Sequence, residues 1–316
     1  MPNYVVTGGA GFIGSHIVEE LVRRKETVKV IDDFSTGKRE NLNGFDKDVE
    51  LIKADISTST DLSAIFSGAD YVIHQAAIPS VPKSMIDPVR SHDSNVNGTL
   101  NVLIGARDAR VKRVVYASSS SLYGDNPILP KKEEMMPNPV SPYGAQKLFG
   151  EIYCQVFTRA YGLETVSLRY FNVFGPRQDA SSEYSGVLAK FIPAVLQNRR
   201  PVIYGDGLQS RDFTYVQNVV NANLLACTAP GVAGEVFNIA CGDRITVNEM
   251  LMEINKITGK GITPVYEAER RGDIKHSQAA VEKAESRLNY KPQTTFVEGL
   301  RHTVEWYAAN VATAGR

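Results

Sequence analysis

The chain has 316 residues, with 35 Lys or Arg and 35 Asp or Glu, so its formal net charge is +0 at pH 7. A balanced charge creates no net field that would draw the protein to nucleic acid or to an anionic membrane, and we expect neither as a partner. This length can bury a substantial core as one large α/β unit or as two domains, and we expect two domains.

The rest of the composition argues against several other classes of protein. The three cysteines, Cys154, Cys227 and Cys241, are far apart and odd in number, which disfavours a disulfide framework. The five histidines show no metal-binding spacing, so we expect no metal site. Apolar runs stay well short of the roughly 20 residues of a membrane span, and the chain enters a strand too early to leave room for a signal peptide. We therefore expect a cytoplasmic protein.

The first predicted elements are a short strand at residues 4–6, a glycine-rich turn at 7–14 and a helix at 15–24. In this order, glycines allow the backbone to approach a pyrophosphate at the helix N-terminus, although the spacing is GxxGxxG rather than GxGxxG. The predicted cofactor contacts in the turn are Gly8, Gly11, Phe12, Ile13 and Gly14. We therefore expect a dinucleotide site here.

The second predicted strand, at residues 28–31, ends at Asp32. An acidic residue about 20 positions after the glycines can accept a hydrogen bond from the adenosine ribose, which favours NAD over NADP. Lys38 and Arg39 follow closely, and these cations leave the choice between the two cofactors open on the residues alone.

Strands continue to alternate with helices, with strands at 49–53, 71–73 and 114–117 and helices from 61 and at 95–107. Such alternation predicts a parallel sheet with right-handed crossovers, whose ligands gather at the carboxyl ends of the strands. The residues at those ends are Asp55, Ile56, Gln75, Ala76, Ala77, Ser118, Ser119, Ser120 and Ser121. Ordinary tight turns would explain the alanines but not four successive serines.

Tyr143 and Lys147 lie four residues apart, so they share one face of a helix that Ser141 can cap and Pro142 can begin. A lysine charge beside a phenol favours the phenolate, and moving the phenol pKa from about 10 toward 7 needs roughly 4 kcal/mol of differential interaction. An isolated pair of this kind is usually an ordinary Tyr and Lys on a solvated helix surface. Downstream of a dinucleotide site, it indicates redox chemistry at a hydroxyl.

Taken together, these segments resemble an extended short-chain dehydrogenase/reductase of the nucleotide-sugar branch. The matching segments are TGGAGFIG at 7–14, HQAA at 74–77, SSSSLYGD at 118–125, SPYGAQK at 141–147, RYFNVFGPRQ at 169–178, SRDF at 210–213 and RRGD at 270–273. The resemblance implies an α/β fold with a doubly wound parallel sheet, or Rossmann fold, and a smaller, partly interleaved C-terminal substrate domain. It places the NAD-binding domain at 1–168, with a returning segment near 208–236, and the UDP-sugar domain at 169–316.

The resemblance also implies roles for the catalytic residues. Tyr143 is the expected base, Lys147 lowers its pKa and holds the nicotinamide ribose, and Ser119 binds the reacting sugar oxygen. A hydride can leave a carbinol carbon only as its hydroxyl proton departs, so base, serine and NAD act as one set. The resemblance further places Asn95 and Tyr170 near the sugar and the nicotinamide.

Ser120 and Ser121 stand where related dehydratases and decarboxylases carry an Asp–Glu pair or a Glu. Without a second acid or base to eliminate water, a 4-keto sugar can only be reduced again. Return of the hydride to the opposite face gives the C4 epimer and regenerates NAD, so the resemblance implies a UDP-sugar 4-epimerase.

The same resemblance assigns the nucleotide-sugar contacts. Arg211 and Arg270 would clamp the diphosphate through paired hydrogen bonds. Asn172 would also contact the diphosphate region, and Tyr204 would pack on uracil, while Asp273 belongs to the same set. Ser277 replaces the bulky tyrosine of glucose-restricted epimerases and leaves room for an N-acetyl group, although loop movement would be an alternative determinant.

Several alternatives remain at this stage. UDP-glucuronate 4-epimerases resemble RYFTVYGPR where this chain has Asn172, which weighs against that substrate. An idle NAD-binding scaffold would be expected to have lost Tyr143, Lys147 or Ser119, and all three are present. A net reductase would require cofactor exchange with bulk solvent. The family further leads us to expect a homodimer formed through two helices per subunit.

Overall fold

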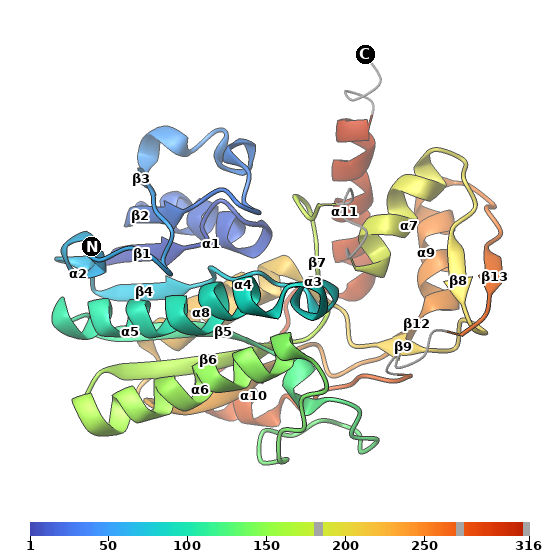
Figure 1. Ribbon diagram of the computed structural model, residues 1–316. Coiled ribbons are helices and arrows are strands. Elements are labelled where there is room, and N and C mark those ends of the chain that lie inside the picture. The colour runs from blue at the N-terminus through green and yellow to red at the C-terminus, as the bar shows by residue number, and fades with distance from the viewer. Residues whose placement is uncertain (180–185, 270–274, 312–316) are drawn as a thin grey trace.

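The computed structural model describes residues 1–179, 186–269 and 275–311. The predicted contacts Arg270 and Asp273 lie outside these residues. Figure 1 shows one sheet flanked by helices, with a smaller group of helices and short strands to one side of it.

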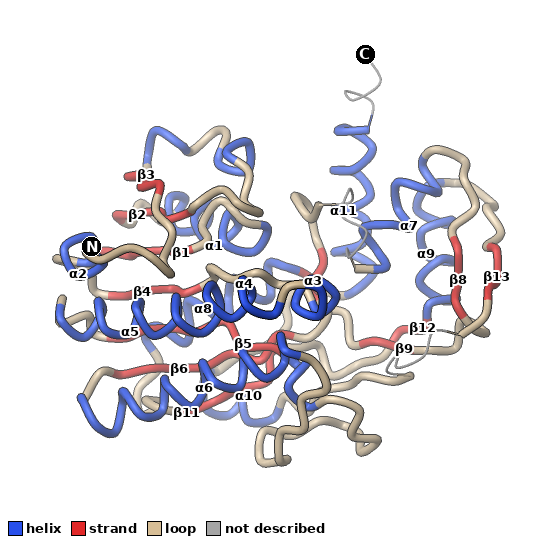
Figure 2. The backbone as a smooth tube through the Cα atoms, viewed as in Figure 1, coloured by secondary structure: helices blue, strands red, loops and turns tan. Residues whose placement is uncertain are grey.

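The centre of the fold is a seven-stranded sheet in the order β11-β6-β5-β4-β1-β2-β3. All neighbouring strands in it run parallel, as Figure 2 lets the reader follow. Its strands are β1 (Asn3–Thr7), β2 (Thr27–Asp32), β3 (Glu50–Lys53), β4 (Tyr71–His74), β5 (Arg113–Ser119), β6 (Glu164–Tyr170) and β11 (Glu235–Ile239). The strand order reverses between β1 and β4, where parallel α/β sheets bind their ligands. The predicted doubly wound parallel sheet is confirmed.

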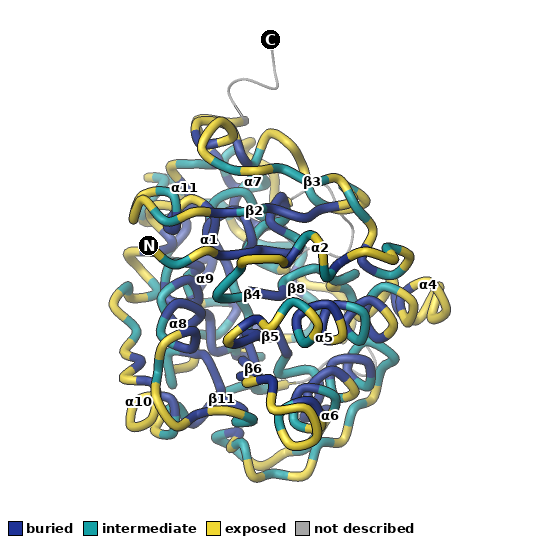
Figure 3. Tube along the Cα trace, turned by 90° about the vertical axis from the view of Figure 1, so that its left-hand side faces the viewer, coloured by how far each residue is buried: buried dark blue, intermediate teal, exposed yellow. Residues whose placement is uncertain are grey.

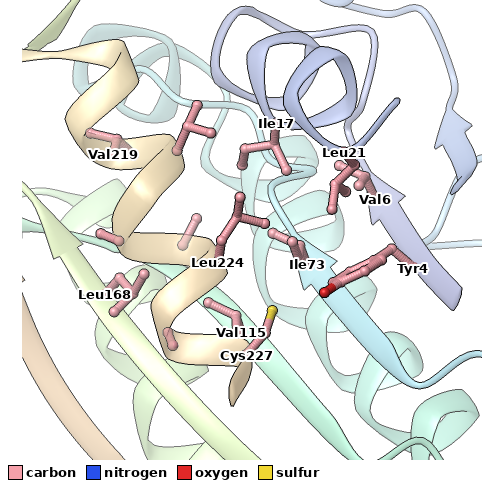
Figure 4. Close-up of a cluster of buried hydrophobic side chains, with 14 of the residues drawn as sticks. Tyr4, Val6, Ile17, Leu21, Ile73, Val115, Leu168, Val219, Leu224 and Cys227 are labelled. Atoms are coloured by element: carbon pink, nitrogen blue, oxygen red, sulfur yellow. The ribbon is translucent and has the colours of Figure 1, made fainter. Parts of the chain in front are cut away.

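Helices cover both faces of the sheet. One face carries α1 (Phe12–Arg23), α8 (Val216–Thr228) and α10 (Glu282–Leu288), and the other carries α2 (Leu62–Phe66), α5 (Gly98–Asp108) and α6 (Pro142–Tyr161). Figure 4 shows the hydrophobic core between the sheet and the helices α1 and α8, in which Leu21 of α1 and Leu224 of α8 lie among side chains of the strands. Burying each such aliphatic side chain stabilises the fold by about 1.5–3 kcal/mol.

Two local features place the helices that border the site. Helix α6 begins as the sequence predicts, because Ser141 Oγ accepts a hydrogen bond from Gly144 N at 3.1 Å and Pro142 occupies the first turn. Helix α5 continues from α3 (Val81–Ile86) and α4 (Pro88–His92) through a π-helical turn at Asp93–Asn97. A π-turn is often found at a functional site, and this one brings Ser94 to the cavity described below.

The smaller domain has its own core, formed by α7 (Val187–Leu196), α9 (Val247–Thr258) and α11 (Phe296–Val311). Its short strand pairs are β7 (Val173–Phe174) with β10 (Thr214–Tyr215), β9 (Ser210–Arg211) with β12 (Ile245–Thr246), and β8 (Val202–Tyr204) with β13 (Val265–Glu267). The pairs β7–β10 and β8–β13 are parallel, and the pair β9–β12 is antiparallel.

The chain passes between the two domains more often than the sequence indicates. The predicted boundary at residue 168 falls inside β6, and β11 extends the returning segment to Ile239. Helix α10 also packs on the sheet, a second return that no sequence pattern announced. Crossing points therefore join the two domains at several places around the site.

Figure 3 shows that buried residues gather along the strands and the inner sides of the helices, whereas α4 is exposed. Among the described residues, none of the helices combines the length and the apolarity that a membrane crossing would require.

Candidate active site

The glycine turn after β1 packs tightly against the end of β4. Gly8 has φ +68°, and a Cβ there would lie 2.6 Å from Ala76 N, while a Cβ on Gly14 would lie 2.1 Å from Gly8 O. Gly8 N donates to Ile31 O at 2.7 Å, and Gly11 N donates to Gly8 O at 3.0 Å. Only glycine fits these two positions. Without side chains there, the turn packs against the neighbouring backbone and leaves the N-terminus of α1 open to an anionic group.

Asp32, the predicted ribose contact, lies at the end of β2 and lines the cavity described below. Its carboxylate accepts hydrogen bonds from Ala10 N and Phe34 N, each at 2.9 Å. Burial raises the pKa of Asp32, and the two backbone donors oppose that shift. Lys38 lies 3.3 Å from Asp179, with which it forms an ion pair. A held carboxylate suits ribose hydroxyls and would repel a 2′-phosphate, so these residues fit NAD better than NADP.

A cavity of about 390 Å³ runs along the carboxyl ends of the strands. Almost all the predicted cofactor contacts line it: Gly8, Gly11, Phe12, Ile13, Gly14, Asp32, Asp55, Ile56, Gln75, Ala76, Ala77, Tyr143, Lys147 and Tyr170. The glycine turn, the predicted ribose contact Asp32 and the predicted catalytic pair therefore share one continuous space, and its residues fit a dinucleotide.

Asn95 is the exception among the predicted cofactor residues. Its side chain is 1% exposed and does not line the cavity within the described residues. Its amide accepts from Ile78 N at 2.7 Å and donates to Gln146 Oε1 at 2.8 Å. Asn95 therefore ties the loop after β4 to α6, and its amide is already engaged in protein contacts.

Tyr143 and Lys147 lie in the first turns of α6. Tyr143 N donates to Ser84 Oγ at 3.1 Å, and the Ser119 hydroxyl lies close enough to the Tyr143 phenol to lower the pKa of that phenol. Lys147 Nζ donates to Ala117 O at 2.8 Å and lies 5.9 Å from the centre of the Tyr143 ring. The structure thus brings the predicted base, the serine and the lysine together at the end of β5.

The pKa of Tyr143 departs from the predicted direction. Burial raises it to about 12, and the hydrogen bond from Ser119 opposes this rise. Burial also lowers the pKa of Lys147 to about 8. In the protein without cofactor, Lys147 does not offset the rise in the phenol pKa, because its ammonium donates to a backbone carbonyl and desolvation dominates both groups. The role of Lys147 in lowering the pKa of Tyr143 stays a prediction.

The serines that follow β5 form a short 3-10 turn, Ser120–Tyr123. Ser121 N donates to Ser119 Oγ at 3.2 Å. Ser121 Oγ is buried without a hydrogen-bond partner among the described residues. Because buried hydroxyls are normally paired, this atom is a candidate for contact with a ligand.

Three predicted nucleotide-sugar contacts gather around β9. Ser277 N donates to Ser210 O at 3.0 Å, so the segment that carries Ser277 runs beside Arg211. Arg211 Nη1 donates to Ser210 O at 3.0 Å and to Lys275 O at 3.2 Å. Asn172 has φ 34° and donates to Asp212 O at 3.1 Å. Tyr204 stands at the end of neighbouring β8.

Comparison with known proteins identifies the family. Residues 4–240, more than half of the chain, match the NAD dependent epimerase/dehydratase family. The chain belongs to this family. The match confirms the family resemblance and NAD as the cofactor.

Similar proteins extend over nearly the whole chain. A putative UDP-glucose 4-epimerase of Methanocaldococcus jannaschii is 40% identical, over 98% of this chain and 99% of its own. The solved UDP-N-acetylglucosamine 4-epimerase from Methanobrevibacter ruminantium M1, in complex with UDP-N-acetylmuramic acid, is 44% identical to this chain, with a TM-score of 0.94. The match covers 98% of this chain and 99% of that structure. The UDP-glucose 4-epimerase from Thermotoga maritima, solved with UDP-glucose, is 39% identical with a TM-score of 0.93. This match also covers 98% of this chain and 99% of the solved one. UDP-glucuronate 4-epimerases of Bacillus cereus also match, at 31% identity or less.

Sequence reasoning missed Asn223, which holds a residue of this epimerase/dehydratase site. Tyr170 OH, which lines the cavity, accepts from Gln75 Nε2 at 2.9 Å and from Asn223 Nδ2 at 2.8 Å. Asn223 is fully buried in α8. Asn223 is one of several amide side chains in α8, so the sequence did not single it out, and only the return of α8 to the sheet shows which tyrosine it holds.

Proposed function

We propose that the protein is a UDP-sugar C4 epimerase that interconverts UDP-GlcNAc with UDP-GalNAc and UDP-glucose with UDP-galactose. The observation that carries the proposal is that Tyr143 and Lys147 line the cofactor cavity beside the end of β5, which carries Ser119, with serines at 120 and 121. This set can remove and return a proton at a sugar hydroxyl, but it has no carboxylate at 120 or 121 to eliminate water.

The chemistry follows from the positions of the side chains. Tyr143 takes the proton from the C4 hydroxyl while Ser119 holds the oxygen. When bound, NAD accepts the C4 hydride and later gives it back. After the 4-keto sugar presents its other face, Tyr143 returns the proton to the same oxygen. Net redox is zero, so no added oxidant or reductant is needed.

Substrate choice is proposed from Ser277 and from the relatives. A small residue beside Arg211 leaves space at C2 for an N-acetyl group. Relatives with 39–44% identity are named for UDP-N-acetylglucosamine and UDP-glucose. We therefore propose that both sugars are accepted and that the acetylated sugar is at least as good.

UDP-glucuronate is the second candidate substrate, supported by the glucuronate 4-epimerases among the matching structures. Asn172 weighs against it, because those enzymes resemble RYFTVYGPR at this segment. An idle scaffold is disfavoured because Ser119, Tyr143 and Lys147 meet in one site.

One experiment separates these possibilities. The purified protein is incubated with UDP-glucose, UDP-N-acetylglucosamine or UDP-glucuronate, without added NAD, and the galacto products are measured. We expect product from the first two sugars and NAD in the supernatant of denatured protein. Product from UDP-glucuronate alone would overturn the proposed substrates, and no product from any sugar would overturn the proposed activity.

We also propose a homodimer. Helix α6 exposes an apolar stripe of Phe149, Ile152 and Val156, which are 50%, 47% and 44% exposed, and Ile104 of α5 is 36% exposed. Residues at this helical spacing form one surface, which a second copy would cover. Light scattering should give the mass of a dimer, and Phe149→Glu should give a monomer. The cytoplasmic location stays a prediction.

A further inference from the structure

Helix α6 presents three ionisable residues, Tyr143, Lys147 and Glu151, at intervals of four. Side chains at this spacing lie on one helix face, which here packs on β5 and β6. Glu151 is 3% exposed. The proposed mechanism uses the first two residues and leaves the buried carboxylate unexplained.

Glu151 is held by two neighbouring strands. Ser118 Oγ of β5 donates to Glu151 Oε1 at 2.5 Å. Arg169 of β6 donates from Nε to Oε1 at 2.9 Å and from Nη2 to Oε2 at 2.8 Å. Arg169 also donates from Nη1 to Tyr123 OH at 2.7 Å. The carboxylate therefore joins α6 to β5 and β6 through paired, charge-assisted hydrogen bonds.

These contacts tie α6 to β5 immediately before the catalytic serine. Lys147 Nζ holds the carbonyl of Ala117, and Glu151 holds the hydroxyl of Ser118. The next residue is Ser119, whose hydroxyl lowers the pKa of the Tyr143 phenol. The hydrogen bonds at Ala117 and Ser118 therefore fix the distance between β5, which carries Ser119, and α6, which carries Tyr143.

A purely stabilising role does not account for the network. Burying an ion pair carries a desolvation cost, so apolar residues of similar volume are often at least as stable. A site that must hold reacting groups within a fraction of an ångström gains directly from such a tie.

We infer that Glu151, fixed by Arg169, is a positioning residue that sets the geometry between Ser119 and Tyr143 through Ser118. The inference rests on the proposed function. Since the hydrogen bond from Ser119 lowers the pKa of Tyr143, a displaced serine would also change the pH at which the base becomes active.

The test compares two hydroxyl deletions at opposite ends of the network. Ser118→Ala removes the tie to the catalytic strand and leaves the ion pair intact. Tyr123→Phe removes a hydroxyl that Arg169 Nη1 contacts at 2.7 Å and that donates to Asn238 Oδ1 at 2.7 Å. Neither substitution changes a charged side chain, and the kinetics, Tm and bound NAD of both proteins are measured.

We expect Ser118→Ala to lower kcat by about tenfold, because small misplacements of reacting groups have effects of up to about a hundredfold. KM for the UDP-sugar should change less than about twofold, and the acid limb of kcat should move to higher pH. Tyr123→Phe should lower Tm at least as much as Ser118→Ala does, yet it should keep the kcat and the pH profile of the wild-type protein. Ser118→Thr, which retains the hydroxyl, should have the kcat and the pH profile of the wild-type protein.

Equal losses of kcat in Ser118→Ala and Tyr123→Phe, or an unchanged pH profile in Ser118→Ala, would overturn the inference. If Ser118→Ala does not fold, Glu151→Asp is used in its place, because the shorter side chain withdraws the carboxylate and retains the charge. The same comparison of kcat and pH profile with Tyr123→Phe then tests the inference. Inactivity of the wild-type protein toward every UDP-sugar would instead reject the proposed function.

Discussion

The two halves of the site are built in different ways. The cofactor half depends on backbone shape, with Gly8 and Gly14 packed so closely that a Cβ would lie within 2.6 Å of a neighbouring backbone atom. The proposed nucleotide-sugar half depends on side chains from segments far apart in sequence, such as Asn172, Arg211 and Ser277. We therefore expect substitutions in the cofactor half to act through the backbone, and substitutions in the proposed nucleotide-sugar half to act through single side chains.

The largest effect is expected where the two halves meet, at Tyr143. Tyr143→Phe removes the proposed base and should lower kcat by about 10²–10⁴-fold, while bound NAD is retained because the cavity stays intact. Kinetics and NAD content of the purified protein test this. Tyr161→Phe, on the exposed end of the same helix, is the matched control. Substantial epimerisation by Tyr143→Phe would count against the mechanism.

Gly14→Ala should damage the cofactor half selectively. A methyl group 2.1 Å from Gly8 O forces the turn apart, and overpacking of this kind costs about 1–3 kcal/mol. We expect lower Tm and loss of bound NAD on purification. Gly261→Ala is the control, since a Cβ at Gly261 meets nothing within 4 Å. Full NAD content in Gly14→Ala would show that the close packing does not matter.

Asp212 gives the nucleotide-sugar half a pH dependence. It is fully buried and accepts from the backbone N–H groups of Cys241, Gly242 and Ala279, at 2.9, 3.1 and 3.1 Å. Burial nevertheless raises its pKa to about 6 from 3.8. A raised carboxyl pKa contributes stability that is complete below the unfolded value near 4 and is lost as pH rises through 6.

The free energy of unfolding should therefore fall, relative to Asp212→Asn, by about 3 kcal/mol between pH 4 and pH 7. Urea titrations of both proteins across this range measure it. A difference between the two proteins that stays constant with pH would mean that Asp212 titrates normally.

The smallest predicted effect is on specificity at Ser277. Ser277→Tyr should lower turnover of UDP-N-acetylglucosamine about tenfold by filling the space at C2, and UDP-glucose turnover should change little. The ratio of kcat/KM for the two sugars is the measurement, with Ser277→Ala as the control for loss of the hydroxyl. Equal turnover of the acetylated sugar by wild type and Ser277→Tyr would exclude this residue as the determinant.

The same difference between the halves explains what the sequence could predict. Contiguous motifs gave the parallel sheet, the glycine turn and the Tyr143–Lys147 pair, because each is local along the chain. The engaged amide of Asn95, the buried Asn223 beside Tyr170 and the second return at α10 depend on segments that meet only in three dimensions. The direction of the Tyr143 pKa also depends on burial, which spacing alone does not supply.

The central claim is that one proton and one hydride leave the sugar and return to it within a single site. UDP-glucose carrying deuterium at C4, incubated with the purified protein in ordinary water without added NAD, tests it most directly. We predict UDP-galactose with full deuterium at C4, because the removed hydride is the one returned. Loss of deuterium to solvent, or dependence of product on added cofactor, would contradict the account.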